Sequence, residues 1–253
     1  MNYLLIGVGI LIILSIIIGY VKGFIKIAVS IGATIATIAL VMFLTPYISD
    51  AIIKYTPLKT VIQEAVVNVV VPEQVSTEDI GKATQLVGED HIEELKEFLA
   101  TKEITLQQQI QLINQAEIPK FLKQGLMNNN NSEVYKILGV DKFVDYVGAY
   151  IVKLIANIVA FIISFIVVTI FIRLLIFSLN IIGALPVFHG FNRVAGAIIG
   201  IVPAIIIIWI AFLIITLAYT TELGKICFAY IDQSQILTFI YNNNPILKYL
   251  SII

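Results

Sequence analysis

Residues 194–219 read VAGAIIGIVPAIIIIWIAFLIITLAY, a run without a charged side chain. A membrane-spanning helix needs about 20 apolar residues, so this run is long enough to cross a bilayer. Its isoleucine and valine content would favour a strand in water, but an unpaired strand in lipid leaves backbone polar groups unsatisfied. The stretch therefore predicts a transmembrane helix.

Three further runs, over residues 3–21, 27–45 and about 150–173, have the same apolar character. The composition agrees, because 59% of the chain is apolar and 13% is charged, whereas a soluble domain has about 45–50% and about 25%. The first run lacks a preceding positive segment, so we interpret it as a retained membrane helix and not as a signal peptide. The predicted fold is an all-α polytopic membrane protein with four transmembrane helices.

The predicted spans divide the chain into four parts: a transmembrane hairpin over residues 1–45, an insert over 46–146, a second hairpin over 147–219 and an amphipathic tail over 220–253.

The insert is expected to form a small helical cap outside the membrane. Apolar side chains recur at helical spacing over residues 90–99, and the Gln-rich residues 105–113 also favour a helix. Ser132 is predicted to cap a helix that continues into the third span. The tail is expected to break at Pro245 and to pack on the cap or lie in the outer membrane interface.

Charged residues are segregated along the chain. Acidic residues occur only between residues 50 and 145 and between 222 and 232. The connection after the first span carries two lysines and no acid, and the only arginines, Arg173 and Arg193, bound the connection before the fourth span. The positive-inside rule places both connections in the cytoplasm. Both termini and residues 46–146 are therefore predicted outside.

The first motif is Gly19-Tyr20-Val21-Lys22-Gly23-Phe24, which joins the first two spans. Glycines four residues apart allow two membrane helices to approach closely. One interpretation makes this a tight helix–turn–helix hinge in which Lys22 anchors the topology. The alternative makes Lys22 a contact for a ligand or a lipid headgroup.

The second motif is an apolar turn containing Pro186, followed by Asn192 and Arg193 and then by Gly196 and Gly200. On one interpretation the asparagine caps the fourth helix, the arginine anchors it, and the glycines form a packing face. On the other, polar residues line a cytoplasmic vestibule. Those residues are Arg173, Asn180, Asn192 and Arg193.

Both motifs resemble those of the colicin V production protein family, in its long-loop Gram-positive form, and the resemblance covers all four spans. The residues that carry it are the Gly-x-x-Lys-Gly-Phe turn at Gly19–Phe24, Leu185-Pro186, Asn192-Arg193, Gly196-x-x-x-Gly200, Ile118-Pro119, Leu122-Lys123 and Tyr135-x-x-Leu138-Gly139-Val140.

Two positions depart from the family pattern. Lys22 stands where the family often has arginine, which keeps the charge but loses bidentate hydrogen bonding. Pro203-Ala204 stands where a polar residue and a glycine are expected, and the proline is expected to kink the helix there.

The resemblance implies a protein of the bacterial cytoplasmic (inner or plasma) membrane, accessory to toxin production or export and to envelope homeostasis. Its implied partners, besides the lipid bilayer, are a second copy of the chain or other envelope and export proteins. The alternative is an oligomeric channel or small-solute permease.

The residues argue against other classes. No carboxylate lies within a predicted span, and His91 and His189 are predicted on opposite sides of the membrane, so we do not expect an enzyme. A single cysteine and isolated histidines give no set of metal ligands, and no cofactor is expected. A net charge of −1 gives no basic footprint for nucleic acid.

Overall fold

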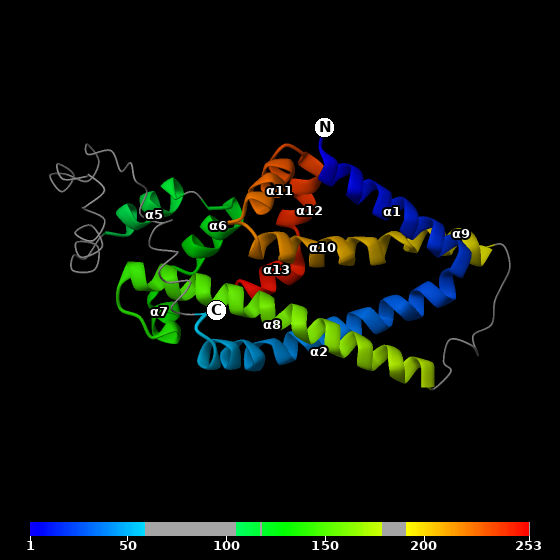
Figure 1. Cartoon of the computed structure of the whole chain (residues 1–253), viewed down its shortest axis with the longest axis horizontal. Coiled ribbons are helices and arrows are strands. Elements are labelled where there is room, and N and C mark those ends of the chain that lie inside the picture. The colour runs from blue at the N-terminus through cyan, green and yellow to red at the C-terminus, as the bar shows by residue number, and fades with distance from the viewer. Residues whose placement is uncertain (59–104, 117, 179–190, 253) are drawn as a thin grey trace. The chain divides into compact units, whose positions relative to one another are not determined.

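The computed structural model describes residues 1–58, 105–116, 118–178 and 191–252 (Figure 1). These residues form helices and contain no strand. Four helices are long and apolar enough to cross a membrane: Tyr3–Lys22, Phe24–Tyr55, Phe143–Phe177 and Phe191–Leu217. The all-α prediction with four spans is thereby confirmed. The predicted helix over residues 90–99 lies outside the described residues.

Helix α1 (Tyr3–Lys22) closely matches the first predicted span, whereas α2 (Phe24–Tyr55) extends well beyond residue 45. Pro46 lies inside α2. A proline within a helix cannot donate to the carbonyl four residues earlier, here that of Met42. The Tyr249 hydroxyl donates to this carbonyl at 3.2 Å. A side chain from the distant tail therefore replaces the hydrogen bond that Pro46 removes.

Removing the Tyr249 hydroxyl tests this replacement. We expect Tyr249→Phe to lower the free energy of unfolding by about 1 kcal/mol, because the Met42 carbonyl then has no donor. In a Pro46→Ala background the same change should cost far less, since the substituted alanine supplies the missing backbone N–H. A double-mutant cycle in detergent measures this coupling. Equal losses in the two backgrounds would show that the hydroxyl does not serve the proline.

The second pair of long helices also differs from the predicted bounds. Helix α8 (Phe143–Ser178) begins before residue 150 and ends after 173, and the fourth span consists of α9 (Phe191–Ile199) and α10 (Ile201–Leu217). Helices α9 and α10 are separated at Gly200. The helical interruption therefore lies at Gly200, whereas the sequence predicted a kink at Pro203. Because Pro203 cannot donate to the Ile199 carbonyl, the interruption lies one turn before the proline.

The chain comprises two compact units: unit 1 is Met1–Asp50 with Asn157–Tyr249, and unit 2 is Ala51–Ala156 with Leu250–Ile253. In unit 2 the Gln-rich segment forms α5 (Leu106–Gln115), opened by a capping box between Thr105 and Gln108. This agrees with the helix predicted for the segment.

Two local predictions in unit 2 were wrong. Helix α6 (Lys120–Asn128) is followed by α7 (Ser132–Leu138), and the residue that caps α7 is Asn131, not Ser132. The Asn131 Oδ1 accepts from the Glu133 and Val134 N–H groups at 3.1 and 3.0 Å. Helix α7 also does not continue into the third span, because Gly139 ends it in the left-handed conformation.

Tyrosines form the core of unit 2. Tyr146 is fully buried, stacks on Tyr135 with ring centroids 4.8 Å apart, and donates to the Leu126 carbonyl at 2.6 Å. The Tyr150 hydroxyl lies against Gly125, where a β-carbon would collide with it. Burial raises the pKa of Tyr135 to about 12. These contacts bind the short helices to the start of α8.

The tail forms α11 (Glu222–Asp232), α12 (Gln235–Asn242) and α13 (Pro245–Leu250), so the break predicted at Pro245 is present. Through Tyr249 the tail belongs to unit 1, where α11 contacts α1 and α10, and α12 contacts α10. The Asn2 side chain caps α1 and also donates to the Tyr230 carbonyl at 2.6 Å. The tail is thus joined to both the first and the last predicted span.

Candidate functional site

Helices α1 and α9 cross at closely spaced glycines of the two sequence motifs. A β-carbon on Gly19 would collide with the Gly196 carbonyl and lie 3.0 Å from the Gly200 Cα. One on Gly196 would lie 2.8 Å from the Gly23 Cα, and one on Gly200 would lie 2.7 Å from the Ser15 carbonyl oxygen. Because these obstacles are backbone atoms, only glycine fits at the crossing.

Two polar side chains fix the crossing. The Ser15 hydroxyl donates to the Gly200 carbonyl at 2.5 Å. The Asn192 Oδ1 accepts from the Ile25 N–H at 3.2 Å, in the first turn of α2. Gly23 has φ +79°, a left-handed backbone, and its Cα faces the Asn192 amide so closely that a β-carbon would collide with it.

Asn192 has a different role from the cap expected for the fourth helix. Helix α9 already begins at Phe191, so Asn192 lies within its first turn. Its carbonyl oxygen instead satisfies a backbone donor at the start of α2. A buried asparagine thereby connects the α1–α2 turn to the fourth span. The local sequence shows that Asn192 is near a helix start, but it does not show which helix it serves.

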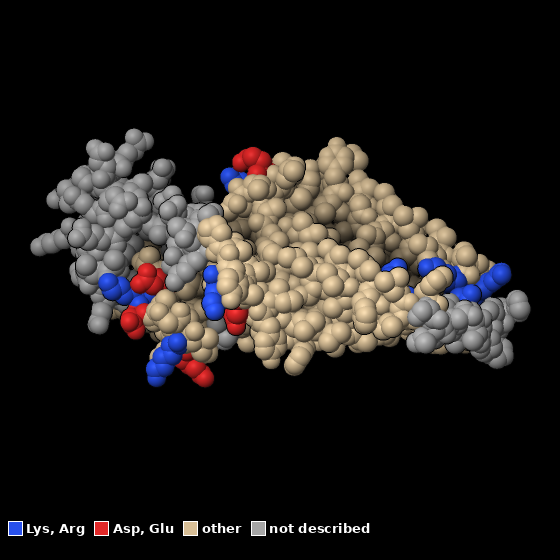
Figure 2. Space-filling view, turned by 60° about the horizontal axis from the view of Figure 1, so that its bottom comes forward, with Lys and Arg blue, Asp and Glu red and all other residues tan. Residues whose placement is uncertain are grey.

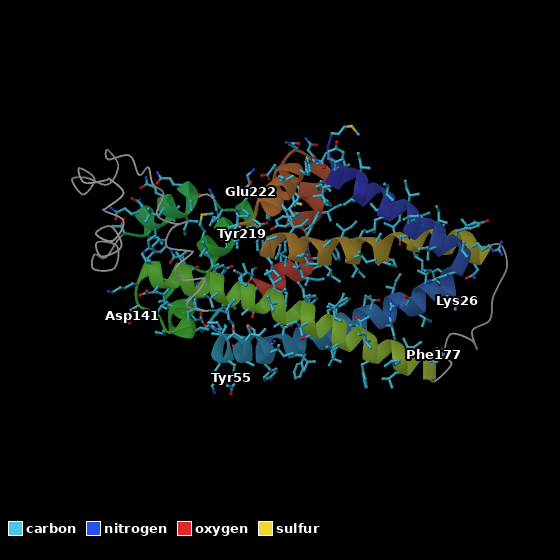
Figure 3. The ribbon with its side chains drawn as sticks, in the orientation of Figure 1. Lys26, Tyr55, Asp141, Phe177, Tyr219 and Glu222 are labelled. Atoms are coloured by element: carbon cyan, nitrogen blue, oxygen red, sulfur yellow. The ribbon has the colours of Figure 1, made fainter. Side chains whose placement is uncertain are left out.

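Charged side chains surround one end of the crossing. Lys22 and Arg193 are exposed next to the contacting residues Gly23 and Asn192, and Lys26 is half-exposed one turn further along α2. Figure 3 shows Lys26 at the α9 end of unit 1 and Glu222 at the opposite end. In Figure 2 the lysine and arginine atoms at this end have no acidic atoms beside them.

The predicted site residues are only partly brought together. The crossing unites Gly19, Gly23, Asn192, Gly196 and Gly200, with Lys22 and Arg193 at its edge. Arg173 is exposed on α8, and the described contacts at the crossing do not include it. Asn180 and Pro186 lie outside the described residues, as does His189. Of the residues predicted to line a vestibule, Asn192 is buried in the helix contact, whereas Arg173 and Arg193 are exposed.

The buried polar groups of unit 1 are mostly satisfied within their own helices. Thr37, Thr45 and Thr216 each donate to the carbonyl four residues earlier. Among the described residues, the hydroxyls of Ser49 and Thr169 and the indole N–H of Trp209 are buried without a partner. The described residues also contain no group of three His, Cys, Asp or Glu side chains placed to hold a metal ion.

The chain was also compared with known proteins. No curated protein and no solved structure matches it. A family model, Colicin V production protein, matches residues 137–245, less than half of the 253 residues. This range includes Asn192, Gly196 and Gly200 but not the Gly19–Phe24 turn. The chain therefore carries a Colicin V production protein domain at residues 137–245.

Proposed function

We propose that the chain is an integral protein of the bacterial cytoplasmic membrane that assists toxin production or export and maintenance of the envelope. The observation that carries this proposal is the Colicin V production protein domain, which lies on α8–α10 and the tail. In this proposal the chain acts by association with other membrane proteins and performs no catalysis. Its termini and residues 46–146 face the outside, as the lysines and arginines of the two short connections favour.

The surface of the first hairpin supports action by association. Ile6, Ile10, Ile13 and Ile17 on α1 each expose between 43% and 58% of their surface. On α2, a β-carbon at Gly32 would meet no atom within 4 Å. An exposed glycine between apolar side chains leaves a shallow notch into which a second membrane helix can pack. A second copy of the chain or an export protein would supply that helix.

A transport experiment separates this function from the channel alternative. The full-length chain is expressed in a bacterium that exports a colicin V-type toxin and lacks its own family member. We expect it to restore toxin release, while the purified protein in liposomes leaves ion and small-solute flux at the level of empty vesicles. Gly32→Leu should reduce toxin release without unfolding the chain, and Ala229→Leu, at an exposed small residue of the tail helix α11, is the control.

Two other outcomes of this experiment would contradict the proposed function. Solute flux that rises with the amount of protein, together with unchanged toxin release, would favour the oligomeric channel. Unchanged toxin release without flux would remove the toxin-related role altogether.

A further inference from the structure

We propose that the basic end of the α1–α9 crossing binds the phosphate of an anionic phospholipid headgroup. The site consists of Lys22, Lys26 and Arg193. Lys22 is the last residue of the first span, and Arg193 lies in the first turn of the fourth span. Side chains at the ends of spanning helices lie at the depth of lipid headgroups, where basic residues meet phosphate groups.

The two chain segments that form this end carry basic side chains and no acidic ones. Residues 1–49 and 146–221 contain no aspartate or glutamate. The α1–α2 turn and the start of α9 therefore meet no acid from either of the segments that contribute the crossing. An anion from outside the chain is the natural counter-charge.

The backbone beneath the charges is held in place. The Asn192 Oδ1 accepts from Ile25, and the Asn192 amide lies against Gly23. Lys22 directly precedes Gly23, and Arg193 directly follows Asn192. These two contacts hold the backbones next to Lys22 and Arg193 close together, and the proposal has both side chains bind one phosphate. A guanidinium binds phosphate through two hydrogen bonds, and an ammonium adds a point charge.

Exposed apolar side chains beside the charges favour a lipid over a soluble phosphate compound. Phe191 exposes 86% and Val21 72% of its surface, on either side of the crossing. In a bilayer such residues contact the upper acyl chains while the neighbouring basic groups reach the headgroups. A free phosphate would use only the charged half of this surface.

A thermal-shift experiment on the full-length chain in uncharged detergent tests the site. Phosphatidylglycerol, phosphatidylcholine and inorganic phosphate are added separately. We expect phosphatidylglycerol alone to raise the melting temperature. Each basic side chain should contribute about fivefold to the affinity, so Lys22→Gln with Arg193→Gln should weaken binding about 25-fold. The matched control, Lys54→Gln with Lys225→Gln, removes the same charge from two exposed residues, one in the last turn of α2 and one on the tail helix α11.

Each other outcome overturns the proposal. An equal shift with phosphatidylcholine would show binding without charge recognition, and a shift with inorganic phosphate would show a site for free anions. Equal weakening in the control pair would show a general effect of net charge. If the double variant does not fold, Arg193→Lys is measured instead, which keeps the charge. Arg193→Lys should weaken phosphatidylglycerol binding less than Arg193→Gln does. If neither Arg193 variant weakens the binding, Arg193 does not contact the headgroup and the proposed site is wrong.

Discussion

Gly196→Ala should lower the free energy of unfolding by about 3 kcal/mol, although it adds a single methyl group. That methyl would collide with the Gly19 carbonyl and with the backbone of Gly23. Backbone atoms cannot move aside as a flexible side chain can, so α1 and α9 must separate. Separation also breaks the hydrogen bond that the Ile25 N–H, at the start of α2, donates to the Asn192 Oδ1.

Gly32→Ala is the matched control for this change. Gly32 also lies within a predicted span, but a β-carbon there meets nothing within 4 Å. Alanine is the better helix former, so this variant should be neutral or stabilised by up to about 1 kcal/mol. Unfolding by denaturing detergent is followed through the fluorescence of Trp209, the only tryptophan. A loss in Gly32→Ala equal to that in Gly196→Ala would refute the glycine crossing.

Asn244→Ala is expected to cost about 3 kcal/mol, the second large effect. Asn244 is fully buried between α12 and α13. Its Nδ2 donates to the Trp209 carbonyl at 3.0 Å, and its Oδ1 accepts from the Ile246 and Leu247 N–H groups at 3.1 and 3.2 Å. Alanine removes the cap of α13 and a direct hydrogen bond between the tail and α10.

The position of the Asn244–Trp209 hydrogen bond along α10 should increase the free energy that Asn244→Ala loses. Trp209 lies sixteen positions after Arg193, which is about 24 Å along a helix. That distance is shorter than the hydrocarbon core of a bilayer, about 30 Å. If the fourth span crosses the bilayer over this length, the Trp209 carbonyl lies where water is scarce, and the N–H groups that Asn244 leaves behind find few replacement partners.

Two further variants separate the roles of Asn244. Asn243→Ala changes an exposed neighbour whose side chain donates to the Phe239 carbonyl, and it should cost less than about 0.5 kcal/mol. Asn244→Asp keeps the oxygen that accepts from the N–H groups of α13 but removes the N–H that donates to the Trp209 carbonyl. Its decrease in the free energy of unfolding should therefore lie between those of Asn243→Ala and Asn244→Ala. If Asn243→Ala and Asn244→Ala are equally stable, the tail is not joined to α10 in this way.

The spans were predictable because lipid requires long uncharged runs, and their number was right. The packing between them was not predictable to the same degree. A helix that is apolar on all sides, such as α10, carries no periodic signal that identifies its buried face. The glycines four apart in each motif did indicate a close approach. They did not identify α1 and α9 as each other's partners.

The missed contacts join residues far apart in the sequence. Asn192 and Ile25 are 167 positions apart, and Tyr249 and Met42 are 207 apart. No local pattern pairs such residues, although Pro46 does indicate a carbonyl without its usual donor. The errors at α7 had local signals that other features outweighed. Asn131 and Ser132 are both good caps, and Gly139 marks a helix end that the apolar residues around it obscured.

A cross-link between the two motifs tests the α1–α9 crossing. Lys22→Cys and Arg193→Cys are introduced together into a Cys227→Ser chain and treated in membranes with a short bis-maleimide. Both positions are exposed beside the Gly23–Asn192 contact. We expect efficient cross-linking within one chain, and little with Lys22→Cys and Lys225→Cys, which lie at opposite ends of unit 1. Failure of the first pair, or cross-links only between chains, would contradict the α1–α9 crossing.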